Sequence, residues 1–379
     1  MAILLNAFGQ SCKSQAAKSN STLKKQYLVS AEAKTTITAN ELKRTYGQLS
    51  AFIKNGYTAY RITYNTTNTA GNNVVASGAV FIPDIKGPLP LLNYDHGTYF
   101  PSQEKSAPSY LHSGSELLLG KLFSGVGYVV AMPDYIGYGA TKNLQHPYGA
   151  YHVIARSVVD MLYAVKELCD KNHVVLSGKN FFSGWSEGAA VALATVKELE
   201  ENHDGRFTPS ATVVNAGPYY SSGFVNHILD AQKPLTYISS YVWILQSYNR
   251  IYGINKPSKY YFNEPAATDL KYGPEAYISH DPQKLFTETF RNNYKAGKDS
   301  ALQNAMLEND LWNWKPLSKI VFCHGDKDDY VPLFNSEKAY TAMKAKGSDV
   351  TLNVFKGHTH SSGVYNFVQQ AFTTFGGSM

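Results

Sequence analysis

The sequence lacks any apolar run of 18 residues or more, so we expect no transmembrane segment. Cysteine is scarce too, and the three present, Cys12, Cys169 and Cys323, can neither build a disulfide framework nor match the spacing of a zinc site. We expect Cys169, in a helical pattern, and Cys323, in an apolar strand, to be buried thiols. Charged residues make up only 17% of the 379 residues and hydrophobic residues 44%, which suits a large buried core and excludes a disordered chain.

The net charge of +6 is concentrated near the N-terminus. Residues 1–48 contain seven Lys and Arg residues against two Glu residues, so +5 lies there and only +1 on the other 331 residues. A folded body so close to neutral has no overall basic footprint for phosphate backbones. We therefore expect no nucleic-acid partner.

The first residues resemble the end of a bacterial lipoprotein signal. A short apolar stretch is followed by small residues and Cys12, although a charged segment before the stretch is missing. This interpretation predicts a signal remnant, a lipid anchor at Cys12 and a secreted or cell-envelope location. A disordered tail with a chance cysteine is the alternative. In both cases residues 1–48 form a polar tether, disordered in part.

The rest of the chain changes pattern twice. Residues 57–66 and 73–83 alternate apolar and polar around an Asn- and Gly-rich turn, which predicts an antiparallel hairpin. Strands then alternate with helices, which predicts a mostly parallel sheet with helices on both faces. The alternation breaks over residues 217–314, a helical, proline-interrupted stretch with 18 aromatic residues. We interpret this stretch as an inserted cap and residues 49–216 and 315–379 as the core.

A Gly-x-Ser-x-Gly motif lies between an expected strand and an alanine-rich helix, with Ser186 at its centre. Glycines at 184 and 188 remove side chains that would collide in a turn tight enough to lift the serine hydroxyl above a sheet. The backbone N–H of Glu187, at the start of the helix, would face an incoming carbonyl oxygen. We expect the Glu187 side chain to be a solvated or capping carboxylate.

A serine hydroxyl needs a base to act as a nucleophile, and candidates follow downstream. An apolar strand runs into an acidic turn with Asp326, Asp328 and Asp329, and a later strand ends before His358 and His360. The histidine pair also fits a metal site, but no carboxylate or cysteine cluster adjoins it, so we expect no metal. No organic cofactor is needed either.

An oxyanion hole needs a second N–H donor. His96 and Gly97 directly follow an early apolar strand, and a tight turn there would aim the Thr98 N–H at the carbonyl oxygen. The alternative is that this dipeptide is only a turn.

Together these motifs resemble the α/β-hydrolases, and more narrowly secreted bacterial lipases and esterases. Five motifs carry the resemblance in order: Val75-Ala76-Ser77-Gly78, Asp95-His96-Gly97-Thr98, Pro133-Asp134-Tyr135-Ile136-Gly137-Tyr138-Gly139, the Ser186 turn, and Gly325-x-x-Asp328-x-x-Val331-Pro332. The resemblance implies an α/β-hydrolase fold: a mostly parallel central sheet flanked by helices, with an inserted, mainly helical cap. The family pattern selects Asp328 as the acid and, counting from Phe355, His360 as the base, with His358 as the alternative.

The resulting hypothesis is a serine hydrolase that cleaves carboxylic esters through an acyl-enzyme, with Ser186, Asp328 and His360 as the catalytic residues. Alternatives within the fold are an esterase for plant aromatic or acetyl esters and a serine peptidase of the prolyl type. A non-enzymatic alternative is a hydrolase-fold binding protein without catalysis. The aromatic cap favours a small ester substrate with an apolar or aromatic part, although aromatic residues there also serve internal packing. Candidate substrate contacts are His96, Tyr99, Trp185, Tyr219, Tyr220 and Trp243.

Overall fold

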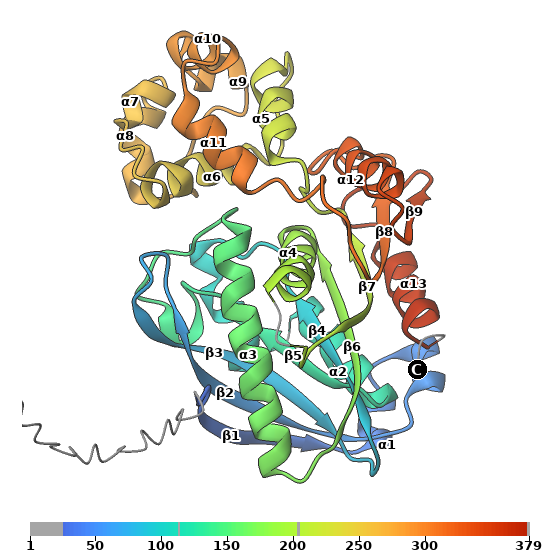
Figure 1. Ribbon diagram of the computed structural model, residues 1–379. Helices are drawn as coiled ribbons and strands as arrows, with labels where there is room; N and C mark the ends of the chain where they lie inside the picture. The colour runs from blue at the N-terminus through green and yellow to red at the C-terminus, as the bar shows by residue number, and fades with distance from the viewer. Residues whose placement is uncertain (1–25, 113, 203–204, 377–379) are drawn as a thin grey trace, which may run out of the picture.

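The computed structural model describes residues 26–112, 114–202 and 205–376 (Figure 1). In this part of the chain nine strands form one sheet, in the order β1-β2-β3-β5-β4-β6-β7-β8-β9. The strands are β1 (Leu28–Ile37), β2 (Tyr57–Thr67), β3 (Asn73–Pro83), β4 (Leu89–Asp95), β5 (Val129–Pro133), β6 (Leu176–Trp185), β7 (Pro209–Asn215), β8 (Lys319–Gly325) and β9 (Val350–Phe355). In this order, the pairs β1–β2, β2–β3 and β3–β5 are antiparallel. All pairs from β5–β4 to β8–β9 are parallel. The sheet is mostly parallel, as predicted.

The predicted hairpin is confirmed by the antiparallel pairing of β2 with β3. Its connection is held by Asn68, whose side-chain oxygen accepts hydrogen bonds of 3.0 Å from the amides of Ala70 and Asn72. An Asn side chain that bonds nearby backbone amides replaces a backbone turn interaction, which is why this residue type occurs here.

Strand β1 corrects the predicted N-terminal tether. Residues 28–37 pair with β2 at the edge of the sheet, and the amide of Leu28 donates to Glu167 on the neighbouring helix at 2.8 Å. An edge strand exposed on both faces needs no apolar alternation, and that is why its Thr-, Lys- and Glu-rich sequence resembles a linker. Residues 28–37 therefore belong to the sheet and not to a tether. Cys12 and the rest of residues 1–25 lie outside the described residues.

Helices cover both faces of the sheet. One face carries α3 (Tyr151–Lys171), α4 (Glu187–Asn202) and α12 (Phe334–Ala345), and the other carries α1 (Ala39–Lys43), α2 (Ser115–Val126) and α13 (Val364–Gly376). Adjacent β6 residues show the division, because Phe182 packs into the first layer and Phe181 into the second. The two layers confirm the α/β fold class.

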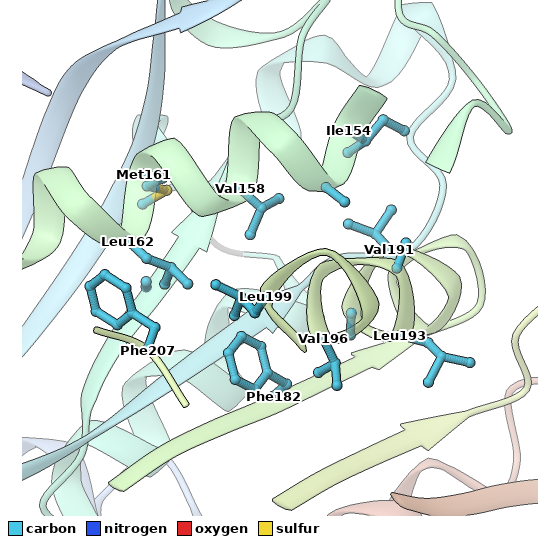
Figure 2. Close-up of a cluster of buried hydrophobic side chains, with 14 of the residues drawn as sticks. Ile154, Val158, Met161, Leu162, Phe182, Val191, Leu193, Val196, Leu199 and Phe207 are labelled. Carbon is cyan, nitrogen blue, oxygen red and sulfur yellow. The ribbon is translucent and has the colours of Figure 1, made fainter. Parts of the chain in front are cut away.

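Helix α3 packs against α4 through the stripe of residues three or four apart that its sequence predicts. Ile154, Val158 and Leu162 are fully buried (Figure 2). Val165 is fully buried as well, while Arg156 on the opposite side is exposed. Burial of each of these side chains stabilises the fold by about 1.5–3 kcal/mol relative to exposure. Helix α4, which begins directly after Ser186, is rich in alanine. Because alanine side chains are small, α4 lies close to the sheet.

The chain between β7 and β8 forms the mainly helical cap. Its helices are α5 (Ser221–Asp230), α6 (Ile238–Ile251), α7 (Ser258–Tyr261), α8 (Ala266–Asp269), α9 (Pro282–Leu285), α10 (Glu288–Lys295) and α11 (Ser300–Glu308). They gather in a separate lobe around a hydrophobic cluster of their own, which also takes in Val331 from the loop after β8 (Figure 1). The cap core is thereby joined to the loop that carries Asp328.

One further sequence expectation is met within the described residues. Cys169 and Cys323 are both free and buried. No helix in the described ranges combines the length and apolar character needed to cross a membrane.

Candidate active site

Ser186 lies in a strained turn between the last residue of β6 and the first residue of α4. Its φ of +60° is in the left-handed region that residues with a side chain rarely adopt. Its amide donates to the carbonyl of Asn215 at 2.9 Å. A Cβ atom at Gly184 would lie 2.2 Å from the Gly188 oxygen, and one at Gly188 would lie 2.0 Å from the Asp95 oxygen. The two glycines therefore permit the turn, as the motif predicts.

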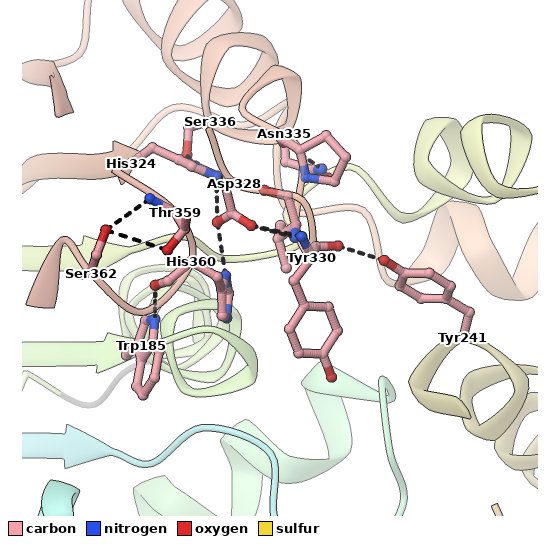
Figure 3. A network of polar contacts seen from close by, with 12 residues as sticks. Trp185, Tyr241, His324, Asp328, Tyr330, Asn335, Ser336, Thr359, His360 and Ser362 are labelled. Carbon is pink, nitrogen blue, oxygen red and sulfur yellow. Dashed lines mark hydrogen bonds and ion pairs between the residues drawn. The ribbon is translucent and has the colours of Figure 1, made fainter. Parts of the chain in front are cut away.

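The acidic turn after β8 places Asp328 against the histidine loop. Its Oδ2 accepts a 2.8 Å hydrogen bond from Nδ1 of His360, and its Oδ1 accepts bonds of 2.9 Å from the amides of Tyr330 and Val331 (Figure 3). The neighbouring acids lie elsewhere: Asp326 accepts from the Gly357 amide, and Asp329 is exposed. Of the three candidate acids, Asp328 is the one that contacts a candidate base.

The two candidate histidines have different environments. His360 is buried, and its backbone carbonyl accepts from the indole N–H of Trp185 at 3.2 Å, which joins the histidine loop to the residue before Ser186. His358 is partly exposed, with Nδ1 3.2 Å from the hydroxyl of Ser362. The geometry thus brings together Trp185, His360 and Asp328 beside the serine turn and leaves His358 outside.

A second histidine, His324, contacts the same carboxylate. It is fully buried, with Nε2 3.2 Å from Oδ2 of Asp328 and 2.7 Å from the Val331 carbonyl. Both partners accept hydrogen bonds, so Nε2 carries the hydrogen. Burial alone raises the pKa of Asp328, but hydrogen bonds from His324 and His360 outweigh it and hold that pKa well below its ordinary value. Sequence reasoning missed His324; a lone polar residue at the end of an apolar strand was the available signal.

The turn after β4 lies directly against the nucleophile. A Cβ atom at Gly97 would lie 3.6 Å from that of Ser186. The Gly97 amide is already committed to the side chain of Glu116, at 2.9 Å from both carboxylate oxygens. Thr98 remains the candidate donor of this turn, and its hydroxyl lies 2.9 Å from that of Tyr148. The amide of Glu187 is the first of α4, where backbone N–H groups have no acceptor within the helix.

Glu116 is a buried acid that no sequence pattern singles out. Tyr94 donates to it at 3.2 Å, and burial raises its pKa to about 7. In sequence it is an ordinary acidic residue in the first turn of a helix, and only the fold brings it under the Gly97 turn. A buried carboxyl group therefore holds the turn that precedes Thr98.

Two of the expected substrate contacts are enclosed by protein. His96 is fully buried, stacks on Tyr99 with ring centroids 4.2 Å apart, and donates from Nδ1 to the Gly97 carbonyl; burial lowers its pKa to about 4. Tyr219 is fully buried against Phe322. Both expectations need correction, because these rings fill the core beneath the site and cannot face a ligand.

The other four candidates differ in exposure. Tyr99 and Trp185 are half-buried. Tyr220 is half-buried against Trp312 of the cap. Trp243 is buried and stacks on Tyr148 at 4.3 Å, so this cap tryptophan reaches the residue that contacts Thr98. Of the candidate aromatic residues in the cap, Trp243 is therefore the one linked to Thr98, through Tyr148.

The side chain of Glu187 is neither solvated nor capping, contrary to expectation. It is 3% exposed, and its Oε1 lies 2.9 Å from Nε2 of His146. The histidine comes from the loop before α3, 41 residues earlier, and no sequence pattern connects the two.

The sequence was compared with protein-family models and with curated proteins. A model of the prolyl oligopeptidase family matches residues 276–375, a segment that includes Asp328 and His360. No curated protein sequence gives a significant match.

Solved structures match almost the whole chain. A Legionella pneumophila protein provisionally described as a hydrolase superposes with a TM-score of 0.83 at 22% identity, over 93% of this chain and 98% of its own. The esterase LipA of Xanthomonas oryzae, described as degrading rice cell wall, gives 0.77 at 22% identity, over 92% and 96%. Candida antarctica lipase A gives 0.66 at 13% identity, over 93% and 82%. The protein therefore has the α/β-hydrolase fold, as the sequence resemblance implied.

Proposed function

We propose that the protein hydrolyses carboxylic esters with Ser186 as the nucleophile. The observation that carries the proposal is the 2.8 Å hydrogen bond from His360 to Asp328, next to a serine held at φ +60° in a Gly-x-Ser-x-Gly turn. A serine in such a turn, a histidine and a buried acid are the parts that activate a hydroxyl for acyl transfer.

In the proposed reaction His360 takes the proton of Ser186 as the hydroxyl attacks the ester carbonyl. Asp328 holds the imidazole in the tautomer with hydrogen on Nδ1 and stabilises the imidazolium that forms. The amides of Thr98 and Glu187 bind the oxyanion of the tetrahedral intermediate. His360 then protonates the departing alcohol, and a water molecule activated by the same histidine releases the acid from the acyl-enzyme.

The cap supports a substrate with an apolar part. It contains a narrow apolar cavity of about 30 Å³, lined by Phe224, Ile228, Tyr241, Ile244, Phe286 and Met306. Tyr241 also donates to the Tyr330 carbonyl at 2.6 Å, and the ring of Tyr330 lies 4.8 Å from that of His360. The apolar lining of the cap is thus linked through Tyr241 and Tyr330 to the base, which supports a substrate with an apolar part.

The test is a panel of p-nitrophenyl esters from acetate to palmitate, with a feruloyl ester added, and labelling by a fluorophosphonate. Ester turnover together with an adduct on Ser186 supports the proposal. Absence of both contradicts it and favours a hydrolase-fold binding protein. A strong preference for the feruloyl ester selects the plant-ester alternative.

The match to the prolyl oligopeptidase family model favours a second candidate, a serine peptidase of the prolyl type. A peptidase would cleave a prolyl p-nitroanilide, whereas an esterase would hydrolyse the esters and leave the anilide intact. The ratio of kcat/KM for the two substrates separates the candidates.

A further inference from the structure

Glu187 combines two features that conflict unless a partner intervenes. Its backbone amide is a proposed donor to the oxyanion, and its own carboxyl group is buried, with 3% of the side chain exposed. An ionised carboxylate held beside a developing oxyanion repels it, and the repulsion is strong where water is excluded.

The partner is His146, which is buried as completely as the acid. Its Nδ1 lies 2.7 Å from the carbonyl of Ile136, which can only accept, so Nδ1 carries a hydrogen. Its Nε2 lies 2.9 Å from Oε1 of Glu187, a contact that requires a proton between the two atoms. Whether that proton is on the imidazole or on the carboxyl group, the pair is neutral as a whole.

The neutrality of this pair is important because a second buried acid, Glu116, lies near the candidate oxyanion hole. On the other side of the turn, the carboxyl group of Glu116 holds the Gly97 amide, and Glu187 is among the charges that raise the pKa of Glu116. Two buried acids thus flank the candidate oxyanion hole. An unpaired, ionised Glu187 would add a full negative charge at this flank.

The loop that carries His146 is firmly placed. The guanidinium of Arg250, on α6 of the cap, donates to the His146 carbonyl at 3.3 Å, and the ring of Tyr138 lies 4.9 Å from the imidazole. A Cβ atom at Gly137 would lie 2.6 Å from the His146 backbone, so that glycine, at φ +100°, permits the close approach. The imidazole is therefore held against Glu187 from both the core and the cap.

We propose that His146 is a positioning residue that keeps Glu187 charge-compensated, so that the Glu187 amide can stabilise an oxyanion. The inference rests on the proposed ester hydrolysis. It assigns a function to a residue 40 positions before the nucleophile that contacts no reacting atom.

The experiment compares His146→Gln, Glu187→Gln and the double variant by ester kinetics at pH 8. His146→Gln keeps a donor towards Glu187 but cannot hold the shared proton, so we expect kcat to fall at least tenfold with KM within threefold. Glu187→Gln removes the charge, so in the double variant kcat returns to within threefold of Glu187→Gln alone. A residue needed only for packing would not be rescued by this second change.

The matched control is His152→Gln. His152 also pairs with a glutamate, with Nε2 3.2 Å from Oε1 of Glu308, but both side chains are more than a third exposed. We expect kcat within twofold of wild type for this variant.

Three results overturn the inference: His146→Gln with wild-type kcat, a folded double variant at least tenfold below Glu187→Gln, or equal losses in His146→Gln and His152→Gln. If His146→Gln fails to fold, the double variant decides, because it contains no unpaired buried carboxylate. Wild-type protein without ester turnover or fluorophosphonate labelling contradicts the proposed function instead, so the two failures are distinguishable.

Discussion

Nε2 of His324 lies 3.2 Å from Oδ2 of Asp328, the same oxygen that accepts from His360. The carboxylate thus has one histidine on the side of Ser186 and another beneath it, on β8. The lower histidine is in turn fixed by Ser336 on α12, whose hydroxyl lies 2.7 Å from Nδ1. Asp328 is therefore oriented before any substrate binds, and its charge is stabilised from both sides.

Removal of the lower histidine is expected to weaken both folding and catalysis. His324→Ala takes away a hydrogen bond to a buried charge, worth about 1.5–3 kcal/mol. We expect a free energy of unfolding lower by about that amount or more and a kcat reduced about tenfold to a hundredfold. Urea unfolding and ester kinetics measure the two effects. A variant with wild-type kcat would show that His324 does not orient Asp328.

The two histidines of the loop after β9 are expected to differ sharply. His360→Ala removes the base that contacts Asp328, so we expect kcat to fall by about 10⁴ or more. His358→Ala removes a partly exposed ring whose Nδ1 faces Ser362, and we expect kcat within about threefold of wild type, as is usual for a surface change. Steady-state kinetics of the pair decide the assignment, and a larger loss for His358→Ala would reverse it.

The strained turn predicts that replacing Ser186 by glycine relieves strain and removes activity. Ser186→Ala and Ser186→Gly both remove the hydroxyl, but only glycine adopts φ +60° without strain. We expect the glycine variant to be more stable than the alanine variant by about 1 kcal/mol in chemical denaturation, with both inactive. The control is Ser361, exposed and without a positive φ, where we expect glycine to be the less stable replacement. The same order at both positions would argue against strain at the nucleophile.

Glu116 predicts a pH dependence of stability. Burial raises its pKa from 4.5 to about 7 in the folded state. A raised acid pKa favours folding while the group is protonated, so this contribution is fully present below pH 4.5 and is lost as the pH rises through about 7. Over that window wild type should lose on the order of 3 kcal/mol relative to Glu116→Gln, which has no charge to bury. Urea unfolding of both proteins at pH 4.5, 6 and 8 measures the difference, and parallel curves would contradict it.

Local sequence patterns predicted the parts of the site that depend on near neighbours. Gly184 is required by contacts within the turn itself, and the stripe beginning at Ile154 follows helical periodicity, so both are visible in a single segment. Gly188 is part of the same motif, but the atom its Cβ would meet is the Asp95 oxygen, at the end of a distant strand. The choice of Asp328 and His360 came from a family pattern, and the structure brings the two together.

The remaining features depend on contacts between distant segments. Glu187 pairs with His146 across 41 residues, and Glu116 reaches Gly97 across 19, so no periodicity marks either pair. Strand β1 was missed because a strand exposed on both faces has no apolar alternation. His96 was expected to face the substrate because of its motif, but an imidazole stacked on Tyr99 and Tyr135 belongs to the core.

The measurement that tests the central claim most directly is the kcat of Ser186→Ala on the best ester of the panel, with folding checked by circular dichroism. We expect kcat to fall by about 10⁴–10⁶ while the fold and its thermal transition are retained, because the hydroxyl is the nucleophile. Ester hydrolysis at a rate near that of wild type in a folded Ser186→Ala protein would contradict the account.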